Sequence, residues 1–133
     1  MNAFVLEDEP FRRDFFVSLG IDQSRIFDHP DRFIEAVQAR DASQDDTLTI
    51  FLDHDLGCYV YEPYKRELTG HDAARAMTAL RVPAQYIVHS INPAGATRIA
   101  LTLQSAGLRV QRVPIFDLMR QHGRNVPVLG SKP

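Results

Sequence analysis

The chain has 133 residues, a formal net charge of −2 and an apolar fraction of 44%, which predict one globular domain able to bury its own core. The slight negative charge excludes a general attraction to nucleic acid or anionic membrane, so any nucleotide must be held locally. A single cysteine, Cys58, excludes an internal disulfide and a thiolate zinc cluster. With no signal-type stretch and no apolar run of membrane-spanning length, we expect a cytoplasmic protein.

Short apolar runs alternate with helical patterns along the chain. Strands are predicted over residues 3–6, 25–27, 47–52, 85–88 and 108–113. Helices are predicted over residues 10–19, 31–39, 69–80, 92–105 and 115–121, with a polar loop at 41–46. Strands that alternate with helices predict a single three-layer α/β/α domain over 1–123, built on a five-stranded parallel sheet. The last ten residues, 124–133, are predicted to be a C-terminal tail.

Local signals mark the ends of several predicted helices. Pro10 suits the first turn of its helix, and Thr69 with Asp72 resembles a capping box. Asn92 precedes a proline and is expected to cap the fourth helix, which Gly107 closes. The first helix carries one apolar stripe, formed by Phe11, Phe15, Phe16 and Leu19.

Polar residues follow three of the predicted strands. They are Glu7-Asp8 after the first strand, Asp53-His54-Asp55 after the third, and His89-Ser90 after the fourth. In open parallel sheets, ligands bind beyond the carboxyl ends of the strands. We therefore expect these three clusters to converge on one edge of the sheet and to form the functional site.

The carboxylates of this edge are candidates for metal binding. Glu7, Asp8, Asp53 and Asp55 bring up to four negative charges together, which would raise one another's pKa values. A divalent cation relieves this repulsion, and oxygen-rich ligands suit Mg²⁺ or Mn²⁺. The alternative is that such acids cap helices and stay in water, which is the interpretation we favour for Glu9.

Histidines and hydroxyls at the same edge offer acid–base and phosphate-binding chemistry. His54 and His89 are candidates for proton transfer or metal ligation. Strand alternation, however, turns His54 away from Asp53. Either histidine, taken alone, would also suit a structural role. Ser90, with the free N–H groups of the following helix, forms a candidate anion site. Asn92 belongs to this site as a substrate-binding candidate as well as a helix cap.

The loop "GCYVYEPYKRELTG" at 57–70 is longer than most strand-to-helix connections. Aromatic residues interleaved with bases suit stacking on a nucleobase and holding phosphate, and the candidates are Tyr61, Tyr64, Lys65 and Arg66. The alternative is a flap held by its own tyrosines, or a contact with a protein partner.

The segments "FVLEDEP", "FLDHDLG" and "VHS" resemble the receiver domain of bacterial response regulators, in order and over nearly the whole chain. The resemblance implies strand order 2-1-3-4-5, an acidic pair for Mg²⁺ at Glu7 and Asp8, a phosphoryl-accepting Asp53, and the family's hydroxyl at Ser90. The lysine that receivers carry after the fifth strand is replaced by Val113.

The segments "DHDLG", "TGHDAA" and "HSINPAGA" are similar to a divergent branch, the cyclic-phosphate-processing receiver-like domains, which are linked to RNA repair. This resemblance implies a metal-dependent phosphoesterase or cyclic phosphate hydrolase acting on a phosphate-containing small molecule or an RNA end. Asp8, Asp53 and Glu7 would hold the metal, which would polarise the phosphoryl group and activate water. His54 or His89 would move a proton, and Ser90 would orient a phosphate oxygen. The alternatives are a signalling module phosphorylated on Asp53, and a binding domain without catalytic activity.

Overall fold

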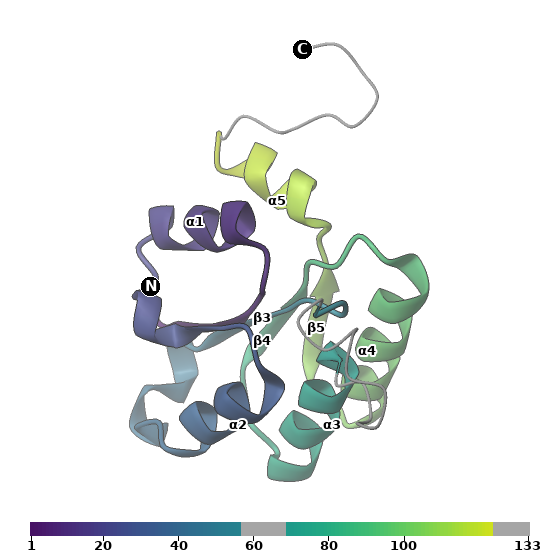
Figure 1. The fold of residues 1–133 in the computed structure, drawn as a ribbon. Helices are drawn as coiled ribbons and strands as arrows, with labels where there is room; N and C mark the ends of the chain where they lie inside the picture. Colours follow the sequence, from purple (N-terminus) through teal and green to yellow (C-terminus); the bar gives the residue numbers. More distant parts are fainter. Residues whose placement is uncertain (57–68, 124–133) are drawn as a thin grey trace, which may run out of the picture.

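The computed structural model describes residues 1–56 and 69–123 and shows a parallel sheet between two layers of helices (Figure 1). The strands are β1 (Ala3–Leu6), β2 (Ile26–Phe27), β3 (Thr49–Leu52), β4 (Gln85–Val88) and β5 (Arg109–Arg112). The helices are α1 (Pro10–Ser18), α2 (Pro30–Gln38), α3 (Gly70–Leu80), α4 (Pro93–Ser105) and α5 (Ile115–Gln121). The strand order β2-β1-β3-β4-β5, parallel throughout, confirms the predicted fold.

Each face of the sheet has its own apolar core, because successive strand residues point to opposite sides. Leu6, Leu52 and Val88 face α2, α3 and α4, which cover one side. Val5 and Phe51 face α1 and α5, which cover the other side (Figure 1). We call the second side the α1–α5 face.

Helix caps agree with the sequence signals. Glu9 caps α1 by accepting the backbone N–H of Arg12, which confirms the capping role expected from the sequence. Thr69 and Asp72 form the predicted capping box of α3. Asn92 caps α4 by accepting the N–H of Gly95. These caps start three helices at the carboxyl edge of the sheet, where the site was expected.

Local predictions are wrong in three places. Phe11 is 50% exposed and lies outside the apolar cluster that Phe15 and Phe16 enter, although it is only one turn away from Phe15. The polar stretch at 41–46 is not an irregular loop, since Ala42–Thr47 forms a 3₁₀ helix, η2, capped by the side chain of Asp41. This helix delays the start of β3 from residue 47 to Thr49. A second short 3₁₀ helix, η1 (Gln23–Arg25), likewise occupies the start of the predicted second strand.

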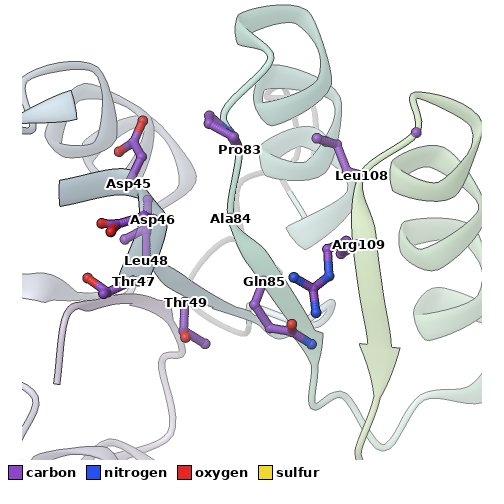
Figure 2. A pocket seen from close by; sticks show the side chains of 11 residues that line it. Asp45, Asp46, Thr47, Leu48, Thr49, Pro83, Ala84, Gln85, Leu108 and Arg109 are labelled. Atoms are coloured by element: carbon purple, nitrogen blue, oxygen red, sulfur yellow. The ribbon is translucent and has the colours of Figure 1, made fainter. Parts of the chain in front are cut away.

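The two ends of the sheet differ in chemistry. A pocket of about 510 Å³ lies at the amino ends of the strands, where Thr49, Gln85 and Arg109 begin β3, β4 and β5 (Figure 2). Within the described ranges, the buried polar residues lie at the opposite, carboxyl end, and they are Glu7, Asp53, His89 and Ser90. The candidate site is therefore placed at the carboxyl edge. None of the described helices has the length and apolar character needed to cross a membrane.

Candidate functional site at the carboxyl edge of the sheet

Strand register places four residues in one row beyond the strand ends. The strands pair Leu6 with Leu52, Leu52 with Val88, and Val88 with Arg112. The residues that follow these partners form the row, and they are Glu7, Asp53, His89 and Val113. Each lies two positions after a strand residue of the α1–α5 face, so alternation directs the row toward that face.

Three members of this row form a buried polar cluster. Glu7 and His89 are 0% exposed and Asp53 is 3% exposed. His89 donates through Nε2 to Glu7 Oε1 at 3.0 Å, and its ring contacts the edge of Phe16 with 5.1 Å between centroids. One potential ligand atom from each of Glu7, Asp53 and His89 lies within 4.8 Å of the others. The cluster is therefore compact enough to surround a single ion.

The pKa values of the two buried carboxyl groups are shifted in opposite directions. Burial raises the pKa of Asp53 to about 6, although the nearby His89 favours its charged form; the negative charge of Glu7 raises this pKa further. Burial also acts to raise the pKa of Glu7, but the hydrogen bond and charge of His89 and the N–H of Glu9 hold it below its ordinary value. His89 thus holds Glu7 as a carboxylate, whereas the positive groups near Asp53 do not offset the effect of burial on its pKa.

The donor set fits a divalent cation. Two carboxylates and an imidazole suit Mn²⁺ and related transition metals, and the carboxylates also suit Mg²⁺. His89 Nδ1 is buried without a hydrogen-bond partner in the part of the chain that the structure describes. Such an unsatisfied polar group is costly in a protein interior. The hydrogen bonds within the cluster therefore do not satisfy all of its polar atoms.

A second set of polar contacts lies beside α4. His54 Nδ1 lies 2.7 Å from Asp55 Oδ1, and the amide nitrogen of Asn92 donates to the same carboxylate at 3.2 Å. The His54 ring packs against Gly95, where an added Cβ would collide with the ring atoms. Asp55 thus fixes the orientation of His54, and a glycine in the first turn of α4 makes room for it.

The start of α3 also packs closely against the turn that follows β3. Gly70 donates its backbone N–H to the carbonyl oxygen of His54 at 2.9 Å. An added Cβ at Gly70 would collide with the backbone carbonyl of Asp53. The "TG" of "TGHDAA" therefore serves the site directly, since it lets a helix terminus approach the turn that carries Asp53 and His54.

The remaining predicted residues lie as follows. Asp8 is half-buried, and its N–H donates to Glu7 Oε2 at 3.0 Å. The carboxylate of Asp55 faces His54 and Asn92. Ser90 Oγ accepts the N–H of Asn92 at 3.1 Å and is 5% exposed. The candidates Tyr61, Tyr64, Lys65 and Arg66, like the predicted tail at 124–133, lie outside the described residues.

Sequence reasoning missed Arg12. This side chain lies in the first turn of α1, and its Nη1 is 4.0 Å from Glu7 Oε1. It is an electrostatic neighbour of both Glu7 and Asp53, and it favours the charged form of each. The sequence signal was present, because an arginine in the first turn of a helix that starts at the carboxyl edge is well placed to reach that edge.

The fold and the polar row define a receiver-like domain, with an aspartate at the end of its third strand. The family model for the cyclic-phosphate processing receiver domain matches residues 5–105, which run from the second half of β1 to the end of α4. The chain therefore belongs to this family and is a receiver-like domain of cyclic-phosphate processing. No curated protein matches the sequence.

Proposed function

We propose that the carboxyl-edge site is a metal-dependent phosphate-handling centre that acts on cyclic phosphates or other phosphoesters of nucleotides or RNA ends. The observation that carries the proposal is the buried cluster of Glu7, Asp53 and His89 in a chain of this family. Its position beyond the carboxyl ends of the strands is where open α/β sheets bind their ligands.

Glu7 and Asp53 would hold Mg²⁺ or Mn²⁺, with Asp8 on the same loop and His89 as further ligand candidates. Asp55 joins them only if its contacts with His54 and Asn92 break. A bound cation would supply positive charge that neutralises the carboxylates and polarises a phosphoryl group. The raised pKa of Asp53 supports this assignment, because the nearby His89 and Arg12 do not offset the cost of burying its charge.

His54 is the better candidate for proton transfer. Asp55 holds Nδ1, which leaves Nε2 to exchange a proton, whereas His89 is fully buried against Glu7. In hydrolysis, the oxygen of water forms a bond to phosphorus while one ester P–O bond breaks. His54 takes the proton of the water and returns a proton to the leaving alkoxide.

Ser90 would orient the phosphate. Its oxygen already accepts the N–H of Asn92, so its own hydroxyl hydrogen is available to donate to a phosphate oxygen. Asn92 acts through Asp55 and through the cap of α4, and it positions both the turn and the helix start.

The test is turnover of nucleoside 2′,3′-cyclic phosphates, followed by ³¹P NMR with Mg²⁺ or Mn²⁺ and with chelator. We expect metal-dependent conversion to a monoester. Asp53→Asn should abolish most of it, and His54→Gln should lower it about 10²–10⁴-fold, the usual contribution of a general acid–base group. Asp46→Asn, an exposed change at the opposite end of the sheet, is the matched control. Metal binding without turnover of any phosphoester would instead identify a binding domain.

A further inference from the structure

Arg12 is a largely sequestered cation with unused hydrogen-bonding capacity. Its side chain is 18% exposed, and its guanidinium lies 5.9 Å from the centroid of the Phe116 ring. The 4.0 Å separation from Glu7 is longer than the 2.7–2.9 Å of a charge-assisted hydrogen bond. Among the described residues, no hydrogen bond uses its guanidinium nitrogens, so its donors lie beside Glu7 without a hydrogen-bond acceptor.

The neighbouring Arg13 has a different role. Its Nη1 donates to the carbonyl oxygen of Glu7 at 2.9 Å, and its Nη2 donates to the carbonyl oxygen of Ile26 at 3.2 Å. These bonds tie α1 to the residue after β1 and to the first residue of β2. The guanidinium of Arg13 thus donates hydrogen bonds to backbone carbonyls, whereas that of Arg12 does not.

The fourth position of the polar row lacks a cation. Val113 is apolar and packs against the core of the α1–α5 face. A phosphate at Asp53 therefore meets no charged donor from this position. Arg12 approaches the same cluster from α1, and Phe116 of α5 supports its guanidinium by a cation–π contact.

The geometry points to Arg12 as the phosphate-binding cation of this site. The inference rests on the proposed function. A guanidinium forms two parallel N–H···O bonds to a pair of oxygens on one phosphorus. A cyclic phosphodiester keeps two non-bridging oxygens, which match this fork, and it adds only one negative charge beside Glu7 and Asp53.

The test is calorimetric binding of uridine 2′,3′-cyclic phosphate, with uridine as the phosphate-free comparison, in Mn²⁺. Arg12→Gln should weaken binding of the cyclic phosphate about tenfold to a hundredfold, as expected for losing bonds to a charged group, and should leave uridine unchanged. Arg12→Lys should recover part of the loss, because it restores the charge without the fork. Arg75→Gln, an exposed arginine on α3, should bind like wild type.

Thermal unfolding separates ligand binding from a structural role. Arg13→Gln should lower the melting temperature clearly, because it frees two backbone carbonyls, whereas Arg12→Gln should change it little. If Arg12→Gln binds the cyclic phosphate as tightly as wild type, the inference is overturned but the proposed function is not. The same holds if the melting temperature of Arg12→Gln falls as far as that of Arg13→Gln. If wild type binds no cyclic phosphate, the proposed function fails and the inference fails with it.

Discussion

Replacing Asp53 by asparagine should stabilise the metal-free protein. Burial raises the pKa of this carboxyl group from 3.8 to about 6, so the folded state disfavours the charged form by about two pKa units. At about 1.4 kcal/mol per unit, the charge lowers the free energy of unfolding by about 3 kcal/mol at neutral pH. Asparagine removes the charge, and its side-chain oxygen can still accept the N–H of His54, which lies 2.9 Å from Asp53 Oδ1.

The pH dependence of this effect has a definite sign. Between pH 3.8 and about 6, the unfolded chain releases the Asp53 proton before the folded chain does, so wild type loses stability as the pH rises. Asp53→Asn lacks this loss. The difference between the two proteins should be small below pH 4 and complete above pH 7. The lowered pKa of Glu7 has the opposite effect, stabilising above about pH 4.5, but it contributes to both proteins.

The assay is urea unfolding followed by circular dichroism, in chelator, at pH 4 and pH 7.5. Asp46→Asn is the control for loss of an exposed charge. Mn²⁺ at a thousand times its Kd should then reverse the order, because it adds about 4.1 kcal/mol to wild type, more than the advantage of the variant. The reasoning is refuted if Asp53→Asn is less stable than wild type in chelator at pH 7.5, or if the difference is the same at both pH values.

Three further predictions concern the same site. Glu7→Gln should destabilise the metal-free protein by about 1–3 kcal/mol, opposite in sign to Asp53→Asn, because both Glu7 oxygens accept hydrogen bonds and an amide keeps only one acceptor; urea unfolding measures this. Gly95→Ala should displace the His54 ring, lowering turnover and costing about 1–3 kcal/mol from overpacking; the imidazole NMR signals report the displacement. Beryllofluoride with Mg²⁺ should yield no stable activated state on Asp53, and a persistent structural shift in the NMR spectrum would contradict this.

The position of the site was predictable because parallel topology brings the carboxyl ends of strands together. Glu7, Asp53 and His89 each come directly after the last strand residue, so register and alternation continue through them. Asp55 comes three residues after β3 ends, where the turn rather than alternation sets side-chain direction. Its contact with His54 and Asn92 could not be derived from spacing.

Arg12 was missed for a related reason. The rotation of α1 about its axis decides which side chains reach the carboxyl edge, and the burial of Phe15 and Phe16 sets that rotation. The sequence grouped Phe11 with these two as one stripe. The structure leaves Phe11 exposed and turns Arg12 toward Glu7. Including Phe11 in the buried stripe therefore gave the wrong rotation for α1, and the contact of Arg12 with the site was not predicted.

The distribution of cations around Asp53 bears on whether the domain is a switch or a phosphate-processing site. In receivers, the lysine after the fifth strand contacts the phosphoryl group and helps to couple it to a conformational change. Here Val113 has no donor, and the described groups that supply positive charge are His89, bonded to Glu7 on β1, and Arg12 on α1. A phosphoryl group on Asp53 would therefore be held from the β1 and α1 side and would exert no charge-assisted pull on β5. Chemistry on a bound phosphate needs no such coupling, and this arrangement of charges favours it.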